Sequence, residues 1–136
     1  MQDDNSKVKL ELKERAYIYG LKIIKFIDCL NKKDFTVQMI AKQLLRSATS
    51  IGVNVIEARE GSSKKDFANF FNYALKSANE TKFWLGLLRD SNKASKERVE
   101  ALLQETKELS NILGASIITL RGRRRKLKAQ NIKCKA

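Results

Sequence analysis

Apolar residues recur every three or four positions along four stretches of the chain, 12–30, 37–58, 67–88 and 99–120. This spacing places the apolar side chains on one face of an α-helix. The stripes are Leu12, Ala16, Tyr19, Ile23, Phe26 and Leu30; Val37, Ile40, Leu44, Ala48, Ile51, Val55 and Ala58; Phe67, Phe71, Ala74, Ala78, Thr81, Leu85 and Leu88; and Val99, Leu102, Thr106, Leu109, Leu113, Ile117 and Leu120. The pattern predicts four amphipathic helices of about 25 residues, each about 37 Å long.

Short polar segments at 31–34, 61–63 and 91–95 separate the four stripes. Asp34 or Thr36 can cap the second helix, and Ser63, followed by Asp66, can cap the third. Ser95 can cap the fourth helix in the same way. Four helices joined by short loops pack naturally as an antiparallel, up-down-up-down four-helix bundle, so the predicted fold class is all-α.

Composition agrees with a single helical domain. The chain has 136 residues, no proline and only 6 glycines, and 43% of it is hydrophobic, which is enough to build one core. Its longest nearly uncharged apolar stretch, 112–120, is much shorter than the roughly 20 residues of a membrane span. The acidic, polar start of the chain is unlike a secretory signal. We therefore expect a cytoplasmic protein with no membrane association.

Positive charge is concentrated at the C-terminus. The net charge is +13, and residues 121–136 contribute +8 of it without any acidic residue, which leaves +5 for the rest. We therefore divide the chain into a bundle domain, 1–121, and a basic tail, 122–136, that is either a frayed helical extension or disordered. A basic block of this density indicates a polyanionic partner, nucleic acid first. The residues predicted to contact phosphates are Arg121, Arg123, Arg124, Arg125, Lys126 and Lys128. The alternative is a charged tail that only maintains solubility.

The residues needed for most catalysis and metal binding are missing. The chain has no histidine, and its two cysteines, Cys29 and Cys134, lack the spacing of a metal or redox motif. A pair among the carboxylates Glu57, Glu60, Asp66 and Glu80 could bind a hard divalent ion, but nothing in their spacing requires one. The sequence therefore predicts no enzyme activity, no metal and no cofactor.

The second and third helices each carry a polar stripe beside the apolar one. It comprises Gln43, Arg46, Ser47, Ser50, Asn54 and Glu57 on the second helix, and Asn69, Asn72, Lys76, Ser77 and Glu80 on the third. Solvent-exposed helix faces usually favour lysine and glutamate over serine and asparagine, which are poorer helix formers. These short side chains indicate hydrogen bonds between helices or between subunits. An ordinary exposed face of low helix propensity is the alternative.

Two blocks of this polar region form a recognisable motif: QLLRSATSIGVNVIE at 43–57, and KDF at 65–67 followed by ALKSANE at 74–80. Together they resemble the family of four-helix-bundle proteins encoded in 23S rRNA intervening sequences, over about residues 10–120. Members are similar to the accessory protein of diversity-generating retroelements, a five-subunit ring that works with a reverse transcriptase and RNA. The resemblance implies a bundle that assembles as a homo-oligomer, plausibly a pentamer, and it suggests no catalytic residue. It implies structural or interface roles for Arg46, Ser47, Asn54, Glu57, Ser77 and Glu80.

Two functions fit these observations. The first is RNA binding through the basic surface, with little base specificity, because no base-reading helix or aromatic platform is evident. The second is a protein-interaction scaffold, such as an accessory subunit that docks a reverse transcriptase. For the second function Tyr73, Phe83 and Trp84 are candidate contacts if they are exposed. The same aromatic residues could instead fill the core or a subunit interface.

Overall fold

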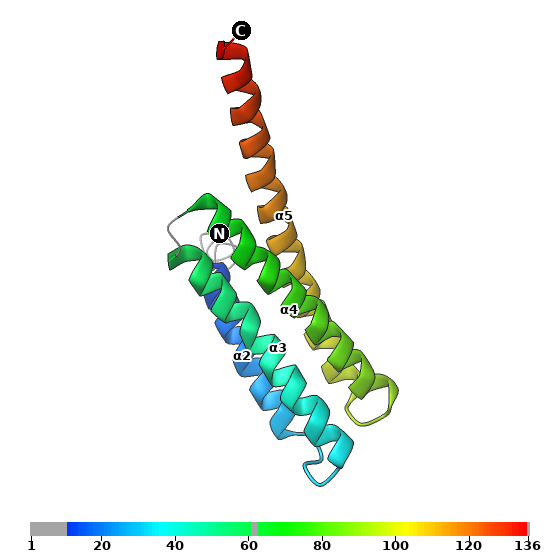
Figure 1. Cartoon of the computed structure of the whole chain (residues 1–136). Helices are drawn as coiled ribbons and strands as arrows, with labels where there is room; N and C mark the ends of the chain where they lie inside the picture. The colour runs from blue at the N-terminus through cyan, green and yellow to red at the C-terminus, as the bar shows by residue number, and fades with distance from the viewer. Residues whose placement is uncertain (1–10, 61–62, 136) are drawn as a thin grey trace, which may run out of the picture.

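The computed structural model describes residues 11–60 and 63–135, without the side chains of residues 123, 124, 127 and 131–135. Four helices make up the described chain: α2 (Leu12–Asp28), α3 (Phe35–Glu60), α4 (Lys64–Asp90) and α5 (Lys96–Lys135). They run alternately up and down and pack side by side, with α3 against α4 most closely and α2 against α5 over a small area (Figure 1). The predicted all-α, antiparallel four-helix bundle is confirmed.

The predicted apolar stripes form the core. Nearly all of their positions are buried, including the central side chains of Tyr19, Leu44, Leu85 and Leu109. The stripe residues that remain partly exposed are Leu30, Ile40, Phe67 and Leu120. Helical periodicity alone was therefore sufficient to identify the buried face of each helix.

Polar caps define where the helices begin. The Val37 amide donates to Asp34 Oδ1 at 3.2 Å, so Asp34 rather than Thr36 caps α3. The Asp66 amide donates to Ser63 Oγ at 3.1 Å at the start of α4. Lys93, in the loop after α4, donates to the other oxygen of Asp34 and thereby ties the two loops at this end of the bundle together. The Lys93 hydrogen bond is the main reason why the pKa of Asp34 lies below its usual value.

The helices differ in length more than the sequence pattern predicts. α3 and α4 have 26 and 27 residues, close to the expected length, whereas α2 has 17 and α5 has 40. α5 continues as one helix through the basic segment and extends past the other three helices (Figure 1). No proline interrupts it, so nothing in the backbone forces it to stop where the bundle ends.

Candidate nucleic-acid interface

The basic segment lies on the part of α5 that extends beyond the bundle. Of the six cations expected to contact phosphates, Arg121, Arg125, Lys126 and Lys128 are exposed, whereas the side chains of Arg123 and Arg124 lie outside the described residues. Arg121, Arg125 and Lys128 are spaced i, i+4 and i+7 and so share one face of the helix. At 1.5 Å per residue they span about 10 Å along the axis. The helix thus presents a short, rigid row of positive charge.

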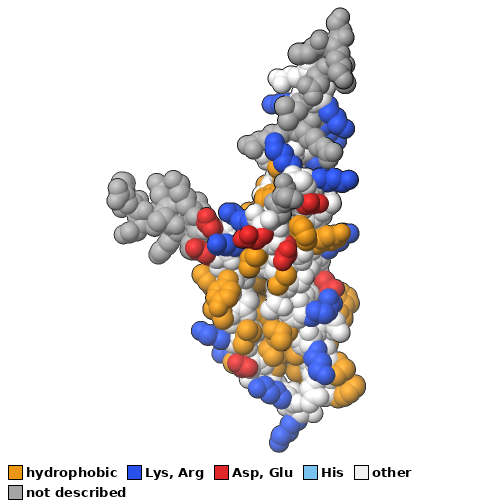
Figure 2. Space-filling view, turned by 60° about the vertical axis from the view of Figure 1, so that its left-hand side comes forward, with side chains coloured by type: hydrophobic (Ala, Val, Ile, Leu, Met, Phe, Trp, Pro, Cys, Tyr) orange, Lys and Arg blue, Asp and Glu red, His pale blue; other side chains and the backbone are white. Residues whose placement is uncertain are grey.

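The charges of this row are not neutralised within the described chain. Its ion pairs, such as those from Arg15 to Glu105 and Glu108, all lie in the bundle or its loops, and none involves Arg121, Arg125, Lys126 or Lys128. In the space-filling view Lys and Arg side chains lie on the upper part of α5, and the acidic side chains seen are lower down, on the bundle (Figure 2). A helix with this charge distribution is suited to contact several phosphates at once.

The polar stripes of α3 and α4 face each other and form a seam of hydroxyl groups. Thr81 Oγ1 donates to Ser47 Oγ at 2.9 Å, and Ser77 Oγ donates to Ser50 Oγ at 3.0 Å. Asn54 extends the seam along α3, because its side-chain amide donates to Ser50 Oγ on the same helix at 3.0 Å. A typical net contribution is about 1 kcal/mol per hydrogen bond, and a larger loss follows when a buried partner is left unpaired.

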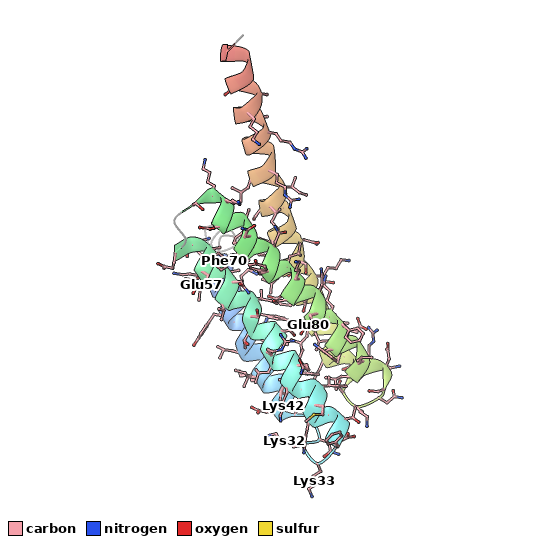
Figure 3. The ribbon with its side chains drawn as sticks, in the orientation of Figure 1. Lys32, Lys33, Lys42, Glu57, Phe70 and Glu80 are labelled. Carbon is pink, nitrogen blue, oxygen red and sulfur yellow. The ribbon has the colours of Figure 1, made fainter. Side chains whose placement is uncertain are left out.

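A second group of contacts covers the exposed side of the seam. The Arg46 guanidinium donates to Glu80, and Trp84 Nε1 donates to the same Glu80 oxygen at 3.1 Å. Arg46 also donates to Gln43 on its own helix. Glu57 is exposed and has no hydrogen bond or ion pair to another described residue, so it stands apart from the other seam residues (Figure 3). The polar stripe residues that make contacts between two helices of the same chain are therefore Arg46, Ser47 and Ser50 of α3 and Ser77 and Glu80 of α4.

The carboxylates considered as metal ligands are not brought together. Glu80 is committed to Arg46 and Trp84, while Glu57 lies toward the other end of α3 (Figure 3). Within residues 11–60 and 63–135 no three histidine, cysteine, aspartate or glutamate side chains gather closely enough to hold a metal ion. None of the helices in this part of the chain is both long and apolar enough to cross a membrane.

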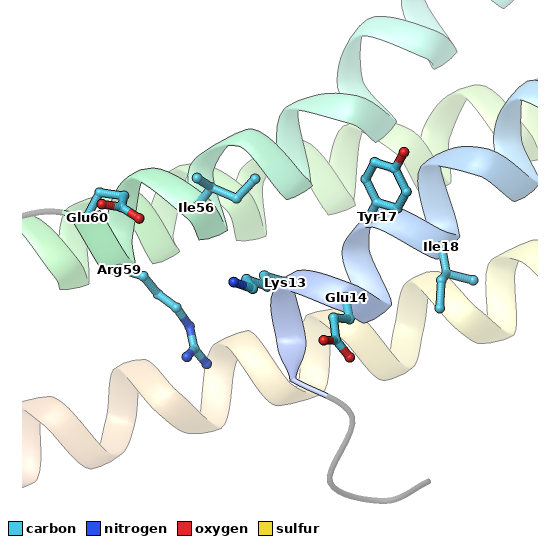
Figure 4. Close-up of a pocket in the computed structure, with 7 residues that line it drawn as sticks. All are labelled: Lys13, Glu14, Tyr17, Ile18, Ile56, Arg59 and Glu60. Carbon is cyan, nitrogen blue, oxygen red and sulfur yellow. The ribbon is translucent and has the colours of Figure 1, made fainter.

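An apolar surface on α2 and α3 was not anticipated from the sequence. A groove of about 570 Å³ is lined by Lys13, Glu14, Tyr17 and Ile18 of α2 and by Ile56, Arg59 and Glu60 of α3 (Figure 4). Tyr17 is 68% exposed there. The signal available in the sequence was a second apolar stripe on α2, Tyr17, Leu21 and Ile24, at the spacing i, i+4 and i+7.

Comparison with known proteins places the bundle in a family. A family model described as 23S rRNA-intervening sequence protein matches residues 8–115, which is most of the chain. The chain belongs to the 23S rRNA intervening-sequence protein family. The match ends before Arg121, so what the family shares is the bundle and its α3–α4 seam, and the basic extension of α5 lies outside the matched region.

A solved structure supports the same assignment. It is a protein of unknown function from the S23 ribosomal protein family of Bacteroides thetaiotaomicron VPI-5482, with a TM-score of 0.73. The two sequences are 35% identical, and the match covers 79% of this chain and 98% of the other. No curated protein matches the chain. The resemblance stated from the sequence motif is therefore confirmed at the level of the intervening-sequence family.

Proposed function

We propose that this intervening-sequence family member is a non-enzymatic, cytoplasmic, oligomeric protein that binds RNA through the basic extension of α5. The observation that carries the proposal is the exposed row of Arg121, Arg125 and Lys128 on a helix that extends beyond the bundle, where none of the three forms an ion pair with another described residue. The family description refers to 23S rRNA, and the structural relative is named after a ribosomal protein family, which supports RNA as the polyanion.

The chemistry of the row favours phosphates over bases. Arginine offers a planar fork of donors that matches two phosphate oxygens, and the release of condensed counterions drives such contacts. Lys126 lies on another side of the helix from Arg121 and Arg125, so the charge also reaches around the axis. We therefore expect binding that is strongly dependent on salt and tolerant of RNA sequence.

The direct test is a salt titration of RNA binding. Fluorescence anisotropy with a labelled RNA hairpin carrying single-stranded flanks gives the affinity from low to high salt. In the variant, Arg121, Arg125, Lys126 and Lys128 are all replaced by glutamine. If all four contact phosphates, the slope of log affinity against log salt should become shallower by about 3, at roughly 0.7 per phosphate contact.

A matched control removes the same charge elsewhere. Lys22, Lys25, Lys33 and Lys42 are exposed on the bundle and have no ion-pair partner among the described residues. Their replacement by glutamine lowers the net charge equally, so affinity and slope should change much less. Equal losses in the two quadruple variants would mean that only net charge matters and that the α5 row is not the binding site.

The oligomer we propose is a homopentamer, on the resemblance to the ring-forming accessory protein of diversity-generating retroelements. In a ring the α5 extensions would act together, and several weak contacts would add to a useful overall affinity. Light scattering on the purified protein should give five times the chain mass of 15.5 kDa. A mass of one chain at the concentration used for RNA binding would refute the ring.

A second candidate function is a scaffold that docks another protein, such as a reverse transcriptase. The exposure of Phe83 (58%) and Tyr73 (50%) on α4 favours it, because exposed aromatic residues are common anchors of protein interfaces. Removal of the residues after Leu120 separates the two functions. RNA binding should be lost in the truncated chain, whereas docking through α4 should survive.

A further inference from the structure

Among the exposed large apolar side chains, which also include Ile18, Phe35, Met39 and Ile118, we distinguish two patches on the bundle. The first, which we call the groove face, consists of Tyr17, Leu21, Ile24, Leu45, Val53 and Ile56 on α2 and α3. The second, the α4 ridge, consists of Tyr73, Phe83 and Leu87. α3 lies between α2 and α4, so the two patches lie on different sides of the molecule (Figure 1).

The groove face has the size of the largest apolar patch on a typical monomer, a patch that is often functional. The exposed parts of its six side chains amount to on the order of 500 Å², near the upper end of the roughly 300–600 Å² for the largest patch on a typical monomer. That area is more than half of the roughly 800 Å² that each partner contributes to a standard interface. Orange side chains gather over the front of the bundle in Figure 2, with Lys and Arg mainly around them. This surface has the size and pattern of an interface.

The groove face is hollowed where Tyr17 and Ile56 line a groove together with Ile18 and four charged side chains, whereas the α4 ridge bears the projecting ring of Phe83. The 570 Å³ groove lies between Tyr17 of α2 and Ile56 of α3, and its volume is sufficient for an aromatic side chain (Figure 4). Phe83, in contrast, projects from α4 with more than half of its surface exposed. A groove and a projecting ring fit each other better than either fits its own copy.

Contacts within the chain hold Phe83 in its projecting position. Its ring packs edge-on against Trp84, with the ring centroids 5.0 Å apart and the planes at 70°. Trp84 is anchored in turn by its hydrogen bond to Glu80, and Glu80 is held by Arg46 across the α3–α4 seam. A side chain ordered before binding loses less entropy when it binds, so this arrangement suits an interface anchor.

We infer that the groove face binds the α4 ridge of a second copy of this chain, with Phe83 inserted between Tyr17 and Ile56. Because the two patches differ and lie on different sides, each subunit can use both at once, head to tail. Contacts of this type close into rings when the rotation between subunits allows it.

The inference rests on the oligomer of the proposed function and names its subunit contact. It is tested first by the molar mass of single variants of the full-length protein. Phe83→Ala and Ile56→Asp should each reduce the mass measured by light scattering from that of the oligomer toward 15.5 kDa. Phe35→Ala is the matched control, because Phe35 is 71% exposed but lies at the start of α3, outside both patches. Equal effects of Phe35→Ala and Phe83→Ala, or no effect of either patch variant, would overturn the inference.

Cross-linking then tests which patches meet. In a background with Cys29→Ser and Cys134→Ser, Lys13→Cys, at the wall of the groove, and Asn79→Cys, one turn before Phe83 on α4, are prepared as separate proteins, so that Ile56 and Phe83 stay in place. Each protein is oxidised alone or after mixing under conditions of subunit exchange. A head-to-tail contact predicts disulfide-linked dimers in the mixture and none in either protein alone. Dimers formed by one protein alone would show that a patch pairs with itself. The absence of dimers in the mixture would show that the α4 ridge does not contact the groove face of another copy. Either result refutes the inference.

RNA binding separates this inference from the proposed function. Phe83→Ala should weaken overall affinity through the loss of multivalency, yet it should keep the salt slope per chain that Arg121, Arg125, Lys126 and Lys128 produce. The quadruple glutamine variant of those residues should keep the mass of the oligomer. If that variant still binds RNA normally while Phe83→Ala is a monomer, the proposed RNA site is wrong and the subunit contact stands.

Discussion

A buried hydrogen bond between α2 and α5 gives the sharpest prediction for the fold. Tyr19 is 0% exposed, and its hydroxyl lies 2.5 Å from Thr106 Oγ1. Thr106 uses its single hydroxyl proton to donate to the Leu102 carbonyl at 2.6 Å. The Tyr19 hydroxyl must therefore be the donor in the pair. Removal of the donor and removal of the acceptor then have different consequences.

The two single variants should destabilise the protein unequally. Tyr19→Phe removes the donor but leaves Thr106 bonded to Leu102, so we expect a loss of about 1 kcal/mol. Thr106→Val leaves the Tyr19 hydroxyl buried without an acceptor, which costs about 1–3 kcal/mol for its desolvation, offset only in part by the added methyl group. The double variant has no unpaired group, so it should be less destabilised than the sum of the singles by at least about 1 kcal/mol.

Urea unfolding followed by circular dichroism at one protein concentration measures these differences. With a slope of about 2 kcal/mol per M for a domain of this size, 1 kcal/mol shifts the midpoint by about 0.5 M. Tyr73→Phe is the control, because Tyr73 is half exposed and its hydroxyl has no partner among the described side chains. Strictly additive effects, or a larger loss in Tyr19→Phe than in Thr106→Val, would refute the assigned direction of the hydrogen bond.

Four further predictions concern stability. Burial raises the pKa of Tyr19 above its usual value. The contribution of Tyr19 to the free energy of unfolding is therefore complete below about pH 10 and is lost as the pH rises further. The melting temperature should decline more steeply at alkaline pH in the wild type than in Tyr19→Phe. Asp34→Asn keeps the cap of α3 but removes the ion pair with Lys93, so it should lower the melting temperature less than Asp34→Ala. Because the pKa of Asp34 is lowered, the ion pair contributes to the free energy of unfolding above the ordinary carboxyl pKa, and this contribution should be lost as the pH falls through the lowered pKa. Asp34→Asn should not show that decline. A Cβ at Gly52 would lie 3.7 Å from that of Ala16, which is an ordinary contact. Gly52→Ala should therefore raise the free energy of unfolding by about 0.5–1 kcal/mol. A lower free energy of unfolding would show that α2 and α3 pack more tightly there.

The polar seam shows how much of a candidate site can be predicted from local sequence patterns. The sequence indicated that Ser47, Asn54 and Ser77 make close contacts, because short polar side chains are unusual on a solvent-exposed helix face. It left open whether the partners belong to another helix or another subunit. The structure pairs Ser50 with Ser77 and Ser47 with Thr81 inside one chain. That choice depends on the register of α3 against α4, which no single helix determines.

The basic segment and the aromatic residues of α4 illustrate the same limit. The sequence located Arg121 and Phe83 and assigned them a charge and a candidate contact. Only the arrangement of the helices showed that Arg121 lies where α5 leaves the bundle and that Phe83 projects outward beside Trp84. The groove between Tyr17 and Ile56 was missed entirely, because its two walls come from different helices.

The sequence by itself determined four helices, the cap at Ser63 and the buried stripe of each helix, because helix periodicity and capping act between residues three or four positions apart. For the cap of α3 it left Asp34 and Thr36 as alternatives. Tertiary structure decided which stripes face each other and hence the Tyr19–Thr106 bond, the seam between α3 and α4, and the surfaces left in water. These features depend on side chains that are far apart in the chain and meet only when whole helices pack. The free energy of that packing is summed over the entire core, so no local segment encodes it.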